Sequence, residues 1–236
     1  MKRYALVTGG SRGIGRAVCI HLASMGLPVI INYRSGQEAA EETLKAVRET
    51  GGEGELLPFD VSDPEAIEKA LADWEEKHPD DYIAVLVNNA GIRKDNLMVF
   101  MQNEEWHSVV DTTLNGFFYT TRRLLKNMLT HRDGRIINMA SLSGLKGVAG
   151  QANYSAAKAA LIGDEGAGTG GGSATRDGER RGTGIYRDGH DGGPRRKEPE
   201  ATRANATLRK SGGSGGTGGL PGLGKGGIYH WAVCVD

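Results

Sequence analysis

Short apolar runs alternate with longer amphipathic segments along the first two thirds of the chain. The short runs are rich in β-branched residues or leucine and are bounded by Gly, Asp or Asn, which predicts strands at Tyr4–Thr8, Pro28–Tyr33, Glu55–Phe59, Ile83–Asn88 and Arg135–Met139. The segments between them have helical spacing, which predicts helices at Gly15–Met25, Gln37–Thr50, Pro64–Lys77 and Glu104–Leu129. This alternation predicts one α/β domain, a Rossmann-like, doubly wound parallel sheet with right-handed crossovers. Ligands of such sheets bind beyond the carboxyl ends of the strands.

The pattern changes after Gly163. More than half of the 37 glycines lie from Gly163 onward, apolar periodicity stops, and Ser211–Gly216 has the composition of a linker. We therefore expect residues 1–163 to form the domain and residues 164–236 to be a glycine-rich, low-complexity tail that is disordered, because too little apolar surface remains to offset its ordering entropy. The sheet is expected to lack its last strands.

Composition excludes several classes of function. The 29 basic residues balance the 29 acidic ones, so no net positive field attracts nucleic acid or an anionic membrane surface. The two cysteines, Cys19 and Cys234, are too few for a disulfide framework or a zinc site, which favours a reducing cytoplasm, and Cys19 falls on the apolar side of a predicted helix. The first apolar run is too short for a signal peptide or a membrane span, so a soluble cytoplasmic protein is expected.

A glycine-rich segment with the spacing G-x-x-x-G-x-G follows the first predicted strand and opens the first helix. Glycines allow the backbone to turn tightly and to approach a diphosphate, while the helix N-terminus favours its negative charge. This position in the chain favours dinucleotide binding over a purely structural turn. The residues assigned to the cofactor here are Thr8, Gly9, Ser11, Arg12, Gly13, Ile14 and Gly15.

The second strand ends without the acidic residue that typically binds the ribose 2′-hydroxyl of NAD. It continues instead as Asn32-Tyr33-Arg34-Ser35. No carboxylate there repels a 2′-phosphate, and Arg12 and Arg34 can pair with one, so NADP(H) is favoured over NAD. Arg34 is also compatible with an ordinary solvated loop.

Two further segments follow strands and are candidates for the cofactor wall. Asp60-Val61 comes after the third strand, where Asp60 either accepts a hydrogen bond from the adenine amino group or caps the next helix. After the fourth strand, Asn88, Ala90 and Gly91 belong to an N-N-A-G segment whose small residues allow the backbone to pass close to the ribose.

A candidate catalytic set follows the fifth strand. Ser141 ends that strand, and Tyr154 and Lys158 are spaced i and i+4, which places them on one face of a helix. Reduction of a carbonyl by hydride transfer creates an oxyanion that needs a proton, and a phenol alone is a poor acid at neutral pH. A nearby ammonium group favours the phenolate and makes the phenol a better acid, while the Ser141 hydroxyl orients the substrate oxygen.

Together these motifs resemble the classical short-chain dehydrogenase/reductase family, whose patterns T-G-x-x-x-G-x-G, N-N-A-G and Y-x-x-x-K match Thr8–Gly15, Asn88–Gly91 and Tyr154–Lys158. Within that family, Gly134–Asn138 and Gly150–Lys158 are most similar to bacterial 3-oxoacyl-(acyl-carrier-protein) reductases. The resemblance implies NADPH-dependent reduction of a 3-oxoacyl thioester on acyl carrier protein in fatty acid synthesis, in a homotetramer. It allows two alternatives: a dehydrogenase of a sugar, polyol or small ketone, or an inactive truncated nucleotide-binding product.

The resemblance also raises two questions about single residues. The family's relay asparagine, a fourth catalytic residue, falls on Thr113, whose hydroxyl can still bind water, with Asn115 nearby on another side of the helix. An arginine that docks the acidic carrier near the site entrance in such reductases falls on Arg132, which is equally compatible with a solvated loop arginine.

The family pattern stops near Gly163, and the tail lacks the family's last strands, cofactor loop and substrate lid. Degenerate codons for Gly163–Gly171, read one base later, permit the expected helix continuation, and those for Gly227–Ala232, shifted by the same base, permit the expected last-strand entry. We hypothesise a frameshift just after residue 163, which resequencing of the coding DNA would test. With the tail as written, poor stability and little activity are expected.

Overall fold

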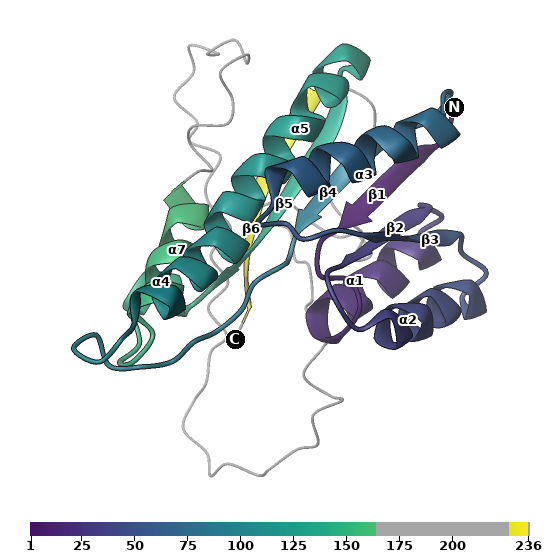
Figure 1. The fold of residues 1–236 in the computed structure, drawn as a ribbon. Helices are drawn as coiled ribbons and strands as arrows, with labels where there is room; N and C mark the ends of the chain where they lie inside the picture. Colours follow the sequence, from purple (N-terminus) through teal and green to yellow (C-terminus); the bar gives the residue numbers. More distant parts are fainter. Residues whose placement is uncertain (164–226, 236) are drawn as a thin grey trace, which may run out of the picture.

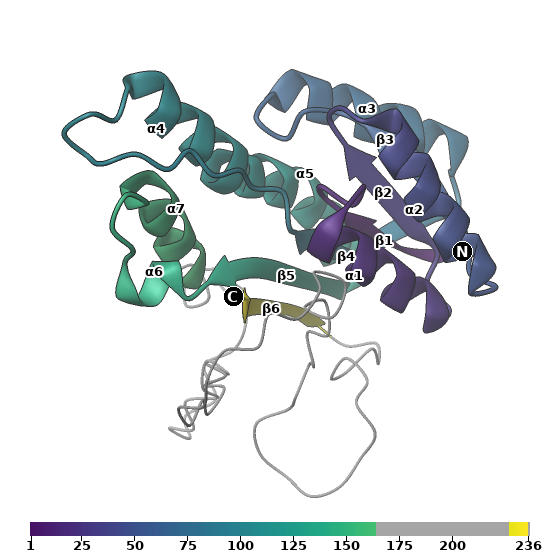
Figure 2. The same cartoon turned by 90° about the horizontal axis from the view of Figure 1, so that it is seen from below.

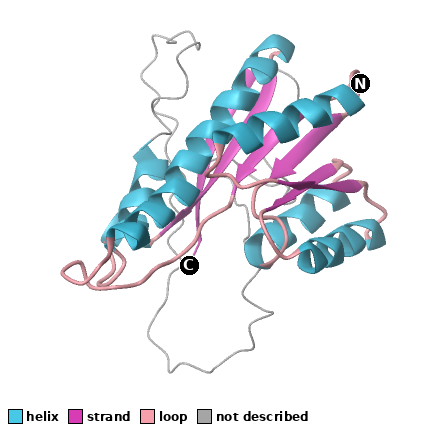
Figure 3. Cartoon of the chain, viewed as in Figure 1, coloured by secondary structure: helices cyan, strands magenta, loops and turns pink. Residues whose placement is uncertain are grey.

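The computed structural model describes residues 1–163, together with the backbone of residues 227–235. Strands and helices alternate along the chain, as Figures 1 and 3 show. The strands are β1 (Arg3–Val7), β2 (Val29–Tyr33), β3 (Gly54–Pro58), β4 (Tyr82–Asn88), β5 (Asp133–Ser141) and β6 (Gly227–Val235). The helices are α1 (Gly13–Ser24), α2 (Gln37–Glu49), α3 (Pro64–Lys77), α4 (Asn103–Val110), the π-helix η1 (Asp111–Asn115), α5 (Gly116–His131), α6 (Ser143–Lys146) and α7 (Ala152–Gly163).

All strands pair in parallel in the order β3-β2-β1-β4-β5-β6. The order reverses between β1 and β4, which is the switch point where doubly wound sheets bind ligands. The first five strands confirm the predicted Rossmann-like parallel sheet. Their observed ends differ from the predicted ones by a few residues, and α3 begins and ends where it was predicted.

The sixth strand is where the structure differs from the sequence prediction. Residues 227–235 pair with β5 from Asp133↔Gly227 to Ser141↔Val235, although the whole tail was expected to be disordered. The segment Gly227–Val235 is rich in apolar and β-forming residues, and β5 offers it an edge with unpaired backbone groups. Residues 164–226 and 236, which were also assigned to the disordered tail, lie outside the described residues.

Helices cover both faces of the sheet, with α1 and α2 on one side and α3, α5 and α7 on the other (Figures 1 and 2). Alternate residues of β1 divide between the two cores that result. Ala5 and Val7 pack with α1 and α2, whereas Tyr4 and Leu6 pack with α3 and α5. The predicted core residue Cys19 is fully buried in the first core, where burial raises the pKa of its thiol to about 12. Burial on both faces explains why these strands are almost continuously apolar.

One predicted helix, Glu104–Leu129, is interrupted in the structure. Residues Asp111–Asn115 within it form η1, and π-helical turns of this kind occur frequently at functional sites. Thr113, the candidate relay residue, lies within η1. No helix in the described part of the chain is long and apolar enough to cross a membrane.

Candidate functional site

A cleft of roughly 310 Å³ lies at the carboxyl ends of the strands. It is lined by residues from the segments after β1, β2, β3 and β4, by the end of β5 and by α7, so it spans the switch point of the sheet. Most of the predicted cofactor residues line it, namely Gly9, Ser11, Arg12, Ile14, Gly15, Arg34, Asp60, Val61, Ala90, Gly91, Tyr154 and Lys158. Thr8, Gly13, Asn88, Thr113 and Ser141 are not among the lining residues.

Thr8 and Asn89 hold the glycine-rich loop against the N-N-A-G segment. The Thr8 hydroxyl accepts hydrogen bonds from the amides of Asn89 and Ala90, each at 3.0 Å, and donates to the Val87 carbonyl. The side-chain amide of Asn89 donates to the carbonyls of Thr8 and Gly9. Thr8 therefore does not line the cleft but holds its wall in place. Asn88 does the same, because its buried side-chain amide donates hydrogen bonds to Thr121 and Asn138.

Asp60 does not cap the next helix. The cap of α3 is Asp63, whose carboxylate accepts from the amides of Glu65 and Ala66 and which is followed by Pro64 in the first turn. One oxygen of Asp60 accepts from the amide and hydroxyl of Ser62, and the other lies 3.6 Å from the Arg34 guanidinium.

The environment of Asp60 also sets its ionisation. Burial acts to raise the pKa of the Asp60 carboxyl, but the hydrogen bonds from Ser62 and the charge of Arg34 outweigh burial and lower that pKa overall. A carboxylate and a guanidinium therefore stand side by side at this end of the cleft.

Tyr154 and Lys158 project from the first turns of α7 into the same cleft. The Tyr154 side chain is 8% exposed and Lys158 is 4% exposed. The ammonium nitrogen of Lys158 lies 5.7 Å from the centre of the Tyr154 ring and donates a hydrogen bond to the Met139 carbonyl in β5. The predicted i, i+4 pair is thus on one helical face, close to the strand end.

Ser141 is the last residue of β5 and is 4% exposed, with its hydroxyl oxygen accepting from the Ser143 amide at 3.2 Å. The buried Thr113 hydroxyl makes no hydrogen bond within the described part of the chain. A Cβ placed on Gly91 would lie 3.4 Å from that hydroxyl and 3.7 Å from the Lys158 ammonium. Thr113 and Lys158 therefore approach the same point of the N-N-A-G backbone.

Sequence reasoning missed three residues of this site. The Arg93 guanidinium lies 5.0 Å from the centre of the Tyr154 ring, and Asn32 is buried beneath the glycine-rich loop. Asn153 is fully buried, and its amide donates to the carbonyls of Lys94 and Glu105, which fastens the loop after β4 to the start of α7. Their places next to predicted site residues in the sequence were the only available signal.

Arg132 lies at the opposite end of β5 from Ser141. The strand has nine residues, so the two ends are about 30 Å apart. Arg132 is the C-cap of α5 with a left-handed backbone, φ 50°. The structure therefore does not place it near the site entrance of its own chain.

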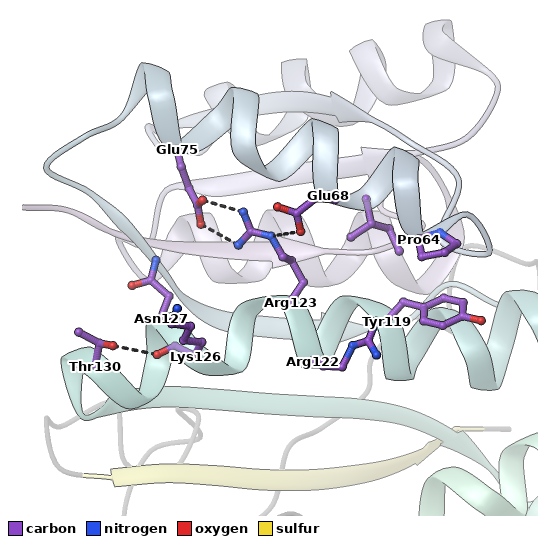
Figure 4. Close-up of a pocket in the computed structure, with 10 residues that line it drawn as sticks. Pro64, Glu68, Glu75, Tyr119, Arg122, Arg123, Lys126, Asn127 and Thr130 are labelled. Carbon is purple, nitrogen blue, oxygen red and sulfur yellow. Dashed lines mark hydrogen bonds and ion pairs between the residues drawn. The ribbon is translucent and has the colours of Figure 1, made fainter.

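A larger groove of roughly 620 Å³ lies between α3 and α5 and contains none of the predicted site residues (Figure 4). Arg123 forms ion pairs there with Glu68 at 2.6 Å and with Glu75 at 2.7 Å. The hydrogen bonds to Glu75 raise the pKa of Arg123. Because this cation is neutralised by two carboxylates, we assign Arg123 to the packing of α3 on α5. Within the described residues, no group of histidine, cysteine or carboxylate side chains could hold a metal ion.

Comparison with known proteins agrees with this geometry. A family model described as short chain dehydrogenase matches residues 3–164. Relatives include the 3-oxoacyl-[acyl-carrier-protein] reductases of Synechocystis sp., 42% identical over 161 residues, and of Pseudomonas aeruginosa, 44% identical over 166 residues. Each match covers 68% of this chain and 64% of the relative, so the chain spans less than two thirds of the length of these relatives. The chain belongs to the short-chain dehydrogenase family, which comprises oxidoreductases that use an NAD(P) cofactor.

Proposed function

We propose that this chain is an NADPH-dependent reductase of 3-oxoacyl thioesters carried on acyl carrier protein. The observation that carries the proposal is the pairing of Tyr154 and Lys158 in a cleft at the sheet's switch point. The names of the relatives, which are about 40% identical, support the substrate class.

The residues of the cleft fit a dinucleotide. The amides of Ser11 and Arg12 have no hydrogen-bond partner within the described part of the chain, and both residues line the cleft at the start of α1. Donors at a helix N-terminus suit a diphosphate. Arg12 and Arg34 supply two cations for a 2′-phosphate, which supports NADPH over NADH, and Asp60 can accept from the adenine amino group.

The chemistry follows from the side chains of α7 and β5. NADPH, when bound, would supply the hydride for the carbonyl carbon of the substrate. The Ser141 hydroxyl orients the carbonyl oxygen, and the Tyr154 hydroxyl gives that oxygen its proton, so that the carbonyl becomes an alcohol. The Lys158 ammonium stabilises the tyrosinate left behind, and the buried Thr113 hydroxyl binds a water that returns the proton.

The test is the oxidation of NADPH by the purified full-length chain. With acetoacetyl thioester as substrate, a fall in nicotinamide absorbance supports the proposal. Activity on a sugar, polyol or small ketone alone would favour another dehydrogenase of the family. Tight NADPH binding without turnover would indicate a silent nucleotide-binding product. Intact-mass spectrometry of the same sample would show whether the tail after Gly163 is the written one.

Arg34→Leu should weaken NADPH binding by about tenfold, because one charge-assisted bond to the 2′-phosphate is lost at a partly exposed position. NADH lacks that phosphate, so its KM should change by less than about twofold. Steady-state KM values for both cofactors measure the effect. An equal loss for NADPH and NADH would show that Arg34 does not read the 2′-phosphate.

Thr113→Val should lower kcat by about tenfold, because it removes the hydroxyl that binds the relay water. The hydroxyl is buried without a protein partner, so its loss should not reduce the free energy of unfolding. Turnover and urea unfolding, measured on the same preparation, separate the two effects. An unchanged kcat would remove Thr113 from the mechanism.

A further inference from the structure

Asn32 occupies a buried position between the glycine-rich loop and strand β3. It is 1% exposed and is the fourth residue of β2. Its side-chain oxygen accepts a hydrogen bond from the Gly9 amide at 3.2 Å, and its side-chain nitrogen donates to the carbonyls of Leu57 and Phe59 at 3.2 and 3.0 Å. Because only the nitrogen can donate to two carbonyls, these partners fix the orientation of the amide.

The backbone of Asn32 acts on the same loop. Its carbonyl accepts a hydrogen bond from the Gly10 amide at 2.8 Å, so one residue binds two successive glycine amides of the loop. The preceding amide, that of Thr8, donates to Val87. The loop amides that remain for a diphosphate are therefore those of Ser11 and Arg12, followed by the first turn of α1.

Asn32 also connects the two ends of the cleft. Phe59, whose carbonyl it binds, directly precedes Asp60, which lies beside Arg34. The glycine-rich loop and the segment that carries Asp60 are thus held at a fixed separation by one side chain. A dinucleotide bound in the cleft spans both.

We infer that Asn32 is a positioning residue for the cofactor diphosphate, an inference that rests on the proposed dinucleotide function. Because the Gly9 and Gly10 amides donate inward to Asn32, the amides of Ser11 and Arg12 are held at the mouth of the cleft before the cofactor binds. Donors that are already in place require no reorganisation on binding. Other side chains also hold the loop. Asn89, which follows β4, donates to the carbonyls of Thr8 and Gly9, and Arg16 and Thr43 on α1 and α2 donate to the Ser11 carbonyl, but none of them provides this link to β2 and β3.

The sharpest test compares two ligands on one variant. Asn32→Leu keeps the approximate size of the side chain and removes its donors and acceptor. NADPH should bind about 10- to 100-fold more weakly, because the Gly9 amide and two carbonyls are left unpaired and the loop is free to move. Adenosine 2′-phosphate, which lacks the diphosphate, should lose less than about fivefold in affinity, because Phe59 keeps its backbone bond to Tyr33 and Asp60 keeps its bonds from Ser62. Isothermal titration calorimetry of both ligands measures the difference.

Leu71→Ala is the matched control for general destabilisation. Leu71 is fully buried on α3, in the core on the other face of the sheet from α1. This control should melt at a lower temperature and yet bind NADPH like the parent chain when both are folded.

The outcomes separate the inference from the function on which it rests. Equal weakening of both ligands in Asn32→Leu would show that Asn32 only supports the fold, and unchanged NADPH binding would show that it does not position the loop; either result overturns the inference. Absence of NADPH binding by the parent chain would overturn the proposed cofactor itself and the inference with it. A selective loss of NADPH binding supports both.

Discussion

Replacing Tyr154 by phenylalanine should lower kcat for carbonyl reduction by about 100- to 10,000-fold, the contribution typical of a positioned general acid. The substitution removes only the hydroxyl. The ring keeps its contacts with the Arg93 guanidinium, 5.0 Å from its centre, and the Lys158 ammonium, 5.7 Å away. NADPH binding should therefore persist. Cofactor titration measures that binding, and turnover under saturating NADPH measures kcat separately.

Tyr119→Phe is the control for this prediction. Tyr119 lies on α5, lines the groove between α3 and α5, and is absent from the cofactor cleft. Its variant should turn over substrate at the parent rate. If Tyr154→Phe also retained the parent rate, the proton would have to come from another group and the proposed mechanism would be wrong.

Gly15→Ala should abolish NADPH binding that is measurable in the parent chain, a loss of more than about 100-fold. Gly15 lies in the first turn of α1, directly beneath the loop. A Cβ there would collide with the Gly9 carbonyl and would lie 2.6 Å from the Asn89 side-chain nitrogen and 3.0 Å from Gly10 Cα. Because two of these contacts are backbone, the loop itself must shift, at a cost of about 1–3 kcal/mol in the free energy of unfolding. Calorimetric titration and urea unfolding measure the two effects.

Gly26→Ala gives the matched substitution outside the site. Gly26 follows α1 with φ +84°, and nothing lies within 4 Å of its added Cβ. Its variant should lose about 1–2 kcal/mol through backbone strain and still bind NADPH like the parent chain. Equal cofactor affinity in the two variants would show that the close packing at Gly15 does not shape the loop.

Local patterns in the sequence were sufficient for most of the fold. Apolar runs predicted the five strands of the domain, and helical spacing predicted α3 from Pro64 to Lys77, the range it has in the structure. The Tyr154–Lys158 pair could be placed on one helical face, since four residues of helix fix their relative direction. The glycine-rich loop was found through its place between a strand and a helix.

What the sequence could not predict depends on contacts between distant segments. The side chain of Asn32 bonds residues 23 to 27 positions away, so its nearness to Arg34 in the sequence does not reveal its partners. Arg93 was missed because the face of Tyr154 that it covers is set by how the loop after β4 meets α7. The strand at Gly227–Val235 requires the edge of β5, which composition alone does not reveal.

The π-helical turn in η1 has a consequence for the numbering of the long helical stretch. Hydrogen bonds in a π-helix join residues five positions apart, one more than in an α-helix, so each residue of η1 turns the helix by less than about 100°. A helical wheel drawn through residues 103–131 as a single α-helix therefore misplaces side chains on one side of η1 relative to those on the other. The faces of α4 and α5 have to be taken from separate wheels, with Val109 marking the buried face of the first and Leu124 and Met128 that of the second.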